Sequence, residues 1–154
     1  MESLLSYLRA HPFLEGMSPR LTEIIVGCAS NVKFDAGDFI FREGETANSF
    51  YLLRHGKVSL EVYAPEGGSV HIQTIGSGEL LGWSWQFAPY TSHFDARAME
   101  MTRAIQLDAK CIRQHCEKDY ELGYEILKRF AHVIHSRFEA MRFQLIELQA
   151  SRTY

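Results

Sequence analysis

The chain has 154 residues, enough for one domain with a sizeable core, of which 46% are hydrophobic and 23% are charged, with a net charge of -3. This balance differs from the clustered basic surface of a nucleic-acid-binding domain, and no apolar run approaches the ~18 residues of a membrane helix. The N-terminus has neither the basic start nor the apolar block of a signal peptide, so we expect a cytoplasmic protein without a membrane span.

Residues 1–30 are predicted to form two short helices. The stretch SLLSYLRA has apolar residues at helical spacing, and His11-Pro12 ends it because the residue before a proline is pushed out of the helical region. Ser18 then provides an N-cap and Pro19 the first position of a second helix. The chain therefore opens with a helical segment.

Between residues 31 and 107 the pattern changes to short apolar segments separated by the turns AGD, EGE, HGK, PEGG and GSG. Apolar and polar residues alternate in KVSLEVY, which places Val58, Leu60 and Val62 on one face of a strand. Regularly spaced short strands of this kind predict an antiparallel sandwich or barrel. The fold class is therefore mostly β with flanking helices (α+β).

Helical patterning returns for residues 108–150, first as a short helix capped by Asp108 and then as a long helix from about Tyr120. The long helix carries a heptad of apolar residues, which is typical of a helix that pairs with a second copy of itself. We therefore predict a homodimer. Its seam is expected to contain Leu127, Ala131, Ile134, Phe138, Met141, Leu145 and Leu148, with Tyr124 extending it at the N-terminal end.

A second apolar row, formed by Ile126, Phe130 and Val133, occupies only the first half of this helix. The first half is therefore expected to pack between the β core and a partner helix, whereas the second half is expected to contact only the partner. The alternative is a helix that lies entirely on its own domain.

Three segments in this order resemble the cyclic nucleotide-binding domain family, and in particular its catabolite-activator (Crp/Fnr-like) regulators. They are DAGDFIFREGETANSFYLLRHGKVSLEVY, the turn GSGELLG, and DARAMEMTRAIQLD. The resemblance implies a β-roll (jelly-roll) with flanking helices and a final helix that forms the dimer seam. It also places a phosphate-binding cassette between residues 78 and 98, where the sequence reads GELLGWSWQFAPYTSHFDARA.

This cassette departs from the family pattern at the charged positions. Gly82 matches the cassette glycine, but Trp83 stands where a glutamate takes the ribose hydroxyl, and Ser92 stands where an arginine takes the cyclic phosphate. Phe94 replaces a small alanine. A charge-assisted hydrogen bond contributes roughly 1.5–3 kcal/mol, so the loss of two such bonds predicts weak binding of cyclic AMP or cyclic GMP.

Two interpretations of the aromatic stretch remain open. The rings of Trp83, Trp85, Phe87 and Phe94 either fill the pocket and leave a ligand-free dimerisation module, or line a reshaped pocket for an unidentified small ligand. An atypical cyclic nucleotide-binding protein is a further alternative. The candidate ligand-binding residues are Gly82, Trp83, Ser84, Trp85, Ser92, His93, Phe94 and Arg97.

The cysteines and histidines predict no metal site or cofactor. Cys28, Cys111 and Cys116 are expected to be reduced thiols in a cytoplasmic protein. Cys111 and His115 are four residues apart on a predicted helix, but two ligands fall short of a tetrahedral structural zinc site. His132 and His135 lie outside the heptad seam and are expected to be solvated. We find no nucleophile–base spacing, so an enzyme is not expected.

The segment after the long helix, LQASRTY, is too short for the DNA-binding domain that follows this helix in the regulators. We therefore expect no direct DNA binding and either a stand-alone sensor or a piece of a longer protein. Its signal is expected to pass through the dimer helix to a protein partner.

Overall fold

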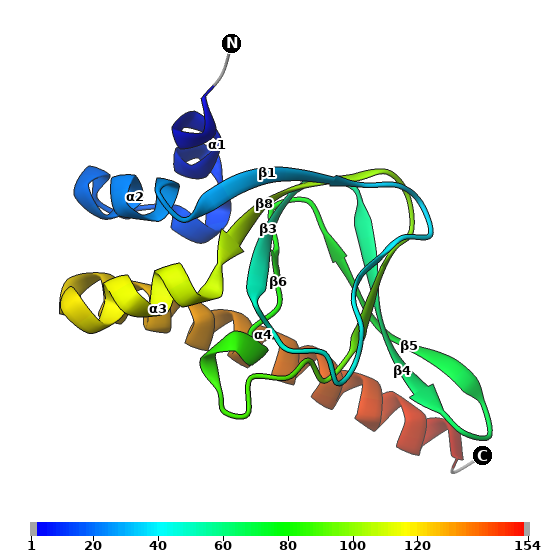
Figure 1. The fold of residues 1–154 in the computed structure, drawn as a ribbon. Coiled ribbons are helices and arrows are strands. Elements are labelled where there is room, and N and C mark those ends of the chain that lie inside the picture. The colour runs from blue at the N-terminus through cyan, green and yellow to red at the C-terminus, as the bar shows by residue number, and fades with distance from the viewer. Residues whose placement is uncertain (1–2, 153–154) are drawn as a thin grey trace.

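The computed structural model describes residues 3–152, in which a β-roll carries helices at one end and a long helix along one side (Figure 1). The N-terminal segment consists of α1 (Leu4–Ala10), the short 3-10 helix η1 (Pro12–Leu14) and α2 (Pro19–Val26). Ser18 caps α2 as predicted, because its hydroxyl accepts a hydrogen bond from the backbone N–H of Leu21. These helices pack at the end of the roll where α3 and the start of α4 also lie.

Two four-stranded antiparallel sheets form the roll, with strand orders β1-β8-β3-β6 and β2-β7-β4-β5. This architecture confirms the predicted fold class. The strands are β1 (Ala29–Phe34), β2 (Phe39–Phe41), β3 (Ser49–His55), β4 (Lys57–Ala64), β5 (Gly68–Gly76), β6 (Leu80–Leu81), β7 (Asp95–Ala98) and β8 (Thr102–Asp108).

The apolar core has two parts. One lies inside the roll, where Leu53, Val58 and Leu60 from β3 and β4 pack against Ala96 and other residues of the facing strands. The other joins the roll to the helices and is centred on Phe50, Trp85 and Phe130. Burial of these side chains, worth about 1.5–3 kcal/mol each, attaches the first half of α4 to the roll.

The polar face of β4 is also covered. Val58 and Leu60 point into the core as the alternation predicts, but Glu61 on the opposite face is buried as well. Arg97 covers it, with Nη2 2.7 Å from Oε2 of Glu61, and Ser69 donates a hydrogen bond of 3.0 Å to Oε1. The Arg97 guanidinium is the main reason that the pKa of Glu61 is lowered to about 2, against the opposing effect of burial.

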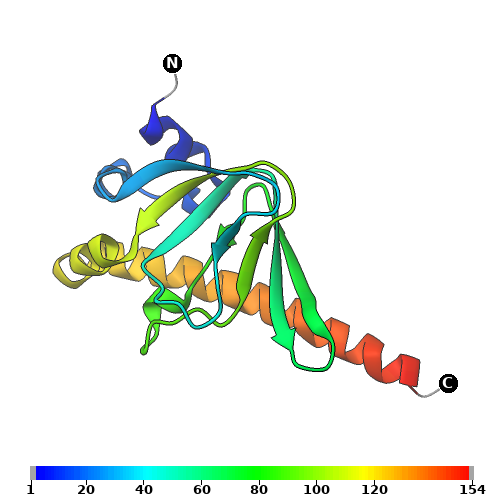
Figure 2. The same ribbon diagram turned by 45° about the vertical axis from the view of Figure 1, so that its right-hand side comes forward.

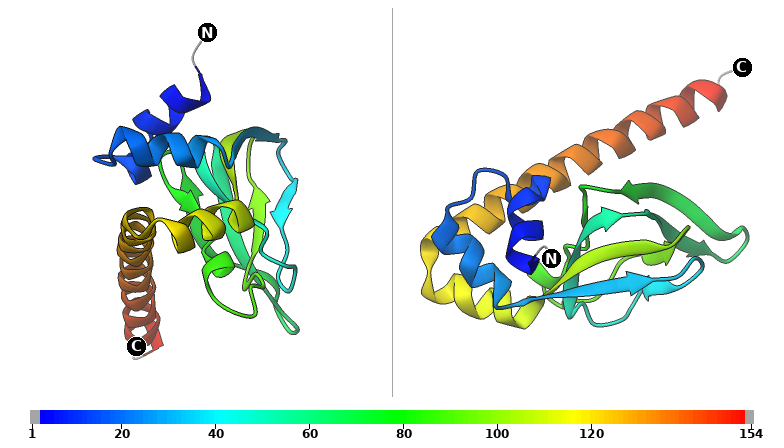
Figure 3. Two further views of the ribbon diagram at one scale, coloured as in Figure 1. Left: turned by 60° about the vertical axis from the view of Figure 1, so that its left-hand side comes forward. Right: turned by 90° about the horizontal axis from the view of Figure 1, so that it is seen from above.

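The C-terminal helices are α3 (Ala109–Lys118) and α4 (Tyr120–Arg152), the second of which is 33 residues long. Figure 2 and Figure 3 show α4 running along the roll and extending beyond it at its C-terminal end. Ile126 and Phe130 of the second apolar row are buried against the roll. Across residues 3–152, no helix combines the length and apolar character needed to cross a bilayer.

The predicted seam residues lie on the surface of this single chain. Tyr124, Leu127, Phe138, Leu145 and Leu148 are each more than half exposed. Ala131 is exposed too, and Ile134 and Met141 are partly buried. The heptad therefore forms an apolar stripe that the protein's own roll does not cover.

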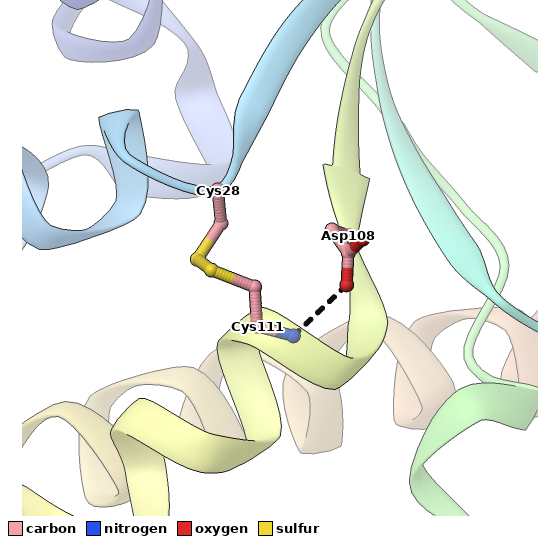
Figure 4. Close-up of a disulfide and its surroundings, with 3 residues drawn as sticks. All are labelled: Cys28, Asp108 and Cys111. Atoms are coloured by element: carbon pink, nitrogen blue, oxygen red, sulfur yellow. Dashed lines mark hydrogen bonds between the residues drawn. A yellow bond between two sulfur atoms is a disulfide. The ribbon is translucent and has the colours of Figure 1, made fainter.

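The expectation of three reduced thiols is wrong in this structure. Cys28 and Cys111 form a disulfide with their Cα atoms 5.7 Å apart, and Cys116 is the free cysteine (Figure 4). The lack of an export signal predicted reduced thiols, but it carries no information on which cysteines the fold brings together. Pairing of β1 with β8 brings the two cysteines together although 83 residues separate them.

Candidate ligand-binding site

The aromatic segment begins with β6 and a glycine that adopts a left-handed backbone conformation. Gly82 has a φ of 94°, a backbone conformation that residues other than glycine rarely adopt. A Cβ there would lie at an ordinary contact distance, 3.8 Å from Cα of Phe50. The chain then forms a short 3-10 helix, η2 (Ser84–Gln86), and returns through a loop to β7. Residues 82 to 94 therefore cross one end of the roll beside α4.

Trp85 belongs to the core. Its side chain is 1% exposed and stacks on Phe50 with ring centroids 4.6 Å apart, and its edge meets Phe130 of α4 at 5.2 Å. Its carbonyl oxygen accepts a hydrogen bond of 2.7 Å from Arg113. Trp85 thus holds η2 between the roll and the helices and lines neither of the cavities described next.

A polar cavity of about 260 Å³, which we call the polar hollow, contains three of the candidate residues: Gly82, Ser84 and Ser92. Ser92 is buried, and its backbone is fixed because its N–H donates to Glu45 and its carbonyl accepts from Gly44. The rest of the wall comes from β2, β3, β8 and the loop before β3. These residues are Ile40, Phe41, Glu45, Thr46, Ala47, Asn48, Ser49, Tyr51 and Gln106.

A second cavity, the closed pocket, holds only about 20 Å³ and shares Phe41, Gly82 and Ser84 with the polar hollow. Trp83, His93 and Phe94 line it, together with Arg137 from α4. This volume is close to that of a single water molecule. Aromatic side chains therefore close the α4 side of the roll, whereas the polar hollow stays open.

Arg97 does not line either cavity. It lies on the face of β7 opposite to Ala96 and Ala98, where it pairs with Glu61. The alternation of the strand sends the alanines into the roll and the arginine away from it. The structure therefore separates Arg97 from the other candidates.

Arg137 was missed by the sequence analysis, and it is the one buried arginine of residues 3–152, at 7% exposed. Its Nη2 donates a hydrogen bond to the carbonyl of Leu80, and its Cζ lies 4.9 Å from the ring centroid of Trp83. Nη1 has no hydrogen-bond partner among the described residues. Burial lowers the pKa of Arg137 to about 10, with Glu79 acting in the opposite direction.

The spacing of the roll-facing row is the signal that could have identified Arg137. Ile126, Phe130 and Val133 follow each other at intervals of four and three residues, and the next interval of four falls on Arg137. Ala140 and Gln144 continue the same face, and both lie beside β5. The row changes from apolar to polar at Arg137, so its apolar part ends at Val133.

The lining of the polar hollow favours a ligand without a large negative charge. None of the described residues around it is a lysine or arginine, and Glu45 is its ionisable acid. Hydroxyl and amide groups from Ser84, Ser92 and Gln106 offer both donors and acceptors. The volume is slightly below the ~300–1,000 Å³ of most ligand sites, so a small, hydrogen-bonding molecule fits best.

A larger groove of about 710 Å³ lies outside the roll, between η1 and α4. Phe13, Lys128, His132 and Arg137 are among its lining residues. Arg137 is thus the residue shared by this groove and the closed pocket. The groove contains none of the residues that the sequence singled out for ligand binding.

Comparison with known proteins gives one family match and several distant relatives. The model of the cyclic nucleotide-binding domain matches residues 31–119. A CRP-like cAMP-activated global transcriptional regulator of Mycobacterium tuberculosis is 24% identical over 117 residues, covering 76% of this chain and 52% of that protein. The cGMP-dependent protein kinase 2 of Homo sapiens is 31% identical over 83 residues, which are 53% of this chain and 11% of the kinase. The chain therefore spans about half the length of the bacterial relative.

Solved structures share the fold. A putative cyclic nucleotide-binding protein from Geobacter metallireducens superposes with a TM-score of 0.80 at 22% identity, covering 89% of this chain and 99% of that chain. The catabolite activator protein of Thermus thermophilus superposes with a TM-score of 0.69 at 20% identity, covering 90% and 63% of the two chains. These identities support the architecture of roll and long helix and leave the ligand open.

Proposed function

The chain belongs to the cyclic nucleotide-binding domain family, and on this basis we propose that it is a sensor domain that binds a small ligand in the polar hollow and signals through α4. One observation carries the proposal. Gly82 and Ser84 line the polar hollow, while Trp83 between them contacts Arg137 of α4. A ligand that moves or orders residues 82 to 84 therefore acts on α4 through the contact between Trp83 and Arg137.

The ligand we propose is a small polar molecule other than cyclic AMP or cyclic GMP. The regulator from Mycobacterium tuberculosis is described as cAMP-activated, but the two charged positions of the family cassette are Trp83 and Ser92 in this chain. The wall around the buried Ser92 offers hydroxyl and amide groups, and none of its described members is cationic. A cyclic phosphate would lose its water without gaining a charged partner.

Arg137 provides the link to the helix. Its buried guanidinium has an unsatisfied Nη1, and an unpaired buried donor costs about 1–3 kcal/mol. A rearrangement of residues 82 to 84 that brings a backbone carbonyl oxygen to Nη1 is therefore favourable. The ligand shifts the population between two positions of α4 to the extent that it binds one of them more tightly.

The output surface is the apolar stripe of α4. Phe138 and Leu145 are 63% and 58% exposed, and they repeat with the spacing of a coiled-coil seam. We propose that a second copy of the chain covers this stripe and that the homodimer passes the signal to a protein partner. Changing Met141 and Leu145 together to glutamate is expected to give monomers in sedimentation experiments, with His135→Glu on the same helix as the control.

A second candidate function is a ligand-free dimerisation module. The closed pocket favours it, because Trp83 and Phe94 reduce the space beside α4 to about 20 Å³. In that case the polar hollow holds only water, and α4 keeps one position. The two candidate functions differ in one respect. In the sensor, a ligand binds in the polar hollow and shifts α4, whereas in the module no ligand binds there.

Thermal unfolding with a panel of small molecules tests the proposal. The panel contains cyclic AMP, cyclic GMP, neutral polar compounds and small aromatic compounds, each measured with the wild type and with Ser92→Phe, which fills the polar hollow. Ser30→Phe, on the exposed face of β1, is the matched control. We expect a neutral compound to raise the midpoint of the wild type and of Ser30→Phe but not of Ser92→Phe. A panel without any such compound contradicts the sensor proposal and favours the module.

A further inference from the structure

We propose that Cys28, Cys111 and His115 form a redox-controlled metal site, which binds a zinc ion when the two cysteines are reduced and releases it when they form the disulfide. The three ligand atoms lie within 4.8 Å of one another. None of these three residues lines the polar hollow, so this inference does not rest on the proposed ligand.

The fold builds the site through strand pairing. β1 and β8 are antiparallel with Ala29 opposite Leu107, and the carbonyl of Cys28 accepts a hydrogen bond of 2.9 Å from the N–H of Asp108. Asp108 also caps α3, because its carboxylate accepts from the N–H of Cys111 at 2.9 Å (Figure 4). One helical turn further, His115 lies on the same face of α3 as Cys111.

The side chains have the chemistry that zinc prefers. Thiolate sulfur and imidazole nitrogen are its usual protein ligands, and tetrahedral ligands at zinc distances lie ~3.3–3.8 Å apart, so rotation of side chains already within 4.8 Å brings them into range. Two thiolates neutralise the charge of a divalent ion, which suits a site where Cys28 is buried. His115 is exposed, so a water molecule can complete the tetrahedron.

Oxidation and metal binding exclude each other at this site, because a sulfur atom in the disulfide no longer offers a thiolate. A hydroperoxide is the oxidant we propose. With hydrogen peroxide, the two zinc-bound thiolates lose two electrons and form the S–S bond, the peroxide takes up these electrons with two protons to give two water molecules, and the zinc ion leaves. Reduction by a dithiol reverses the change and restores the ligands.

The site joins two segments that are distant in the sequence. Cys28 lies between α2 and β1, and Cys111 lies in the first turn of α3, which leads into α4. Either the disulfide or the metal ion therefore ties the helical end of the chain to the roll. Between the two states, the reduced and metal-free chain lacks this connection.

Metal titration of the intact chain, with any histidine tag removed, tests the inference. The protein is reduced with a phosphine, freed of metal with a chelator, exchanged into buffer without either reagent under argon, and titrated with zinc and separately with cobalt. We expect one ion per chain, a thiolate-to-cobalt charge-transfer absorption, and release of the zinc when hydrogen peroxide is added. Cys28→Ser, Cys111→Ser and His115→Gln are each expected to weaken zinc binding by more than ~10-fold, as even outer-shell partners contribute this much.

Cys116→Ser is the matched control, because Cys116 is the neighbouring cysteine and lies outside the site. It is expected to bind zinc as the wild type does. His115→Gln changes an exposed residue and keeps the fold, which circular dichroism verifies, so a loss of binding in this variant is not a loss of structure. The inference is overturned if the reduced wild type takes up no zinc, or if binding survives in the Cys28→Ser and Cys111→Ser variants, or if peroxide leaves the zinc bound.

Discussion

Removal of the Cys28–Cys111 disulfide is expected to destabilise the domain strongly. The bond closes a loop of 83 residues, and the entropy that such a cross-link removes from the unfolded chain corresponds to about 4–5 kcal/mol. For a domain of this size, 1 kcal/mol shifts the unfolding midpoint by roughly 2–4 °C, so reduction is expected to lower it by roughly 10–20 °C. A typical domain is stable by ~5–15 kcal/mol, so the reduced chain is expected to stay folded but only marginally.

Guanidinium denaturation of the oxidised and the phosphine-reduced protein, both in the presence of a chelator, measures this difference. Thiol titration before each experiment verifies the redox state. Cys111→Ser is expected to behave as the reduced wild type does under both conditions, whereas Cys116→Ser keeps the full difference. A stabilising disulfide is ruled out if the oxidised and reduced forms unfold at the same denaturant concentration, or if the oxidised protein contains three free thiols.

Three further predictions concern the cassette, a turn and a buried ion pair. Restoring the cationic cassette position with Ser92→Arg, in the wall of the polar hollow, is expected to raise the affinity for cyclic AMP by about 10- to 10²-fold in calorimetric titrations, as one bond of ~1.5–3 kcal/mol is regained. Gly56→Ala is expected to lower the free energy of unfolding, measured in denaturant, by at least ~2 kcal/mol more than Gly37→Ala does. Both glycines have positive φ, but only a Cβ at position 56 would meet backbone, because it would lie 2.7 Å from Cα of Thr102. The pKa of Glu61 is lowered from 4.5 to about 2, so the stability that its carboxylate contributes is present above pH 4.5 and is lost as the pH falls toward 2. Glu61→Gln is therefore expected to be less stable than the wild type at neutral pH, by about 1–3 kcal/mol, and to lose less stability in acid.

Local patterns sufficed for the fold. Ser18 and Pro19 defined the start of α2, and the glycine-bearing turns marked the strands, because caps and turns depend on neighbouring residues. The order of helices, strands and long helix then indicated the family, which the match over residues 31–119 confirms. The second apolar row of α4 also predicted correctly which face packs on the roll, as the burial of Ile126 and Phe130 shows.

The arrangement of the candidate site depended on contacts between distant segments. Trp85 and Trp83 are two residues apart, yet Trp85 enters the core and Trp83 lies against Arg137, and nothing in the aromatic stretch distinguishes them. Arg137 itself is a charged residue in a buried position, which composition argues against. The partner of Cys28 is set by the register of β1 and β8, and no pattern within either segment specifies it.

A titration followed by nuclear magnetic resonance shows whether a ligand in the polar hollow acts on α4. In the labelled protein, the backbone amides of Gly82, Ser84 and Ser92 report on the polar hollow, and the side chain of Arg137 reports on α4. Small polar compounds are added to this sample, with cyclic AMP as a comparison. We expect at least one compound to shift the amide signals of the polar hollow and the Arg137 signal together, and micromolar cyclic AMP to leave all of these signals unchanged. The sensor proposal is contradicted if compounds that occupy the polar hollow never shift the Arg137 signal, or if no compound in the panel binds in the polar hollow.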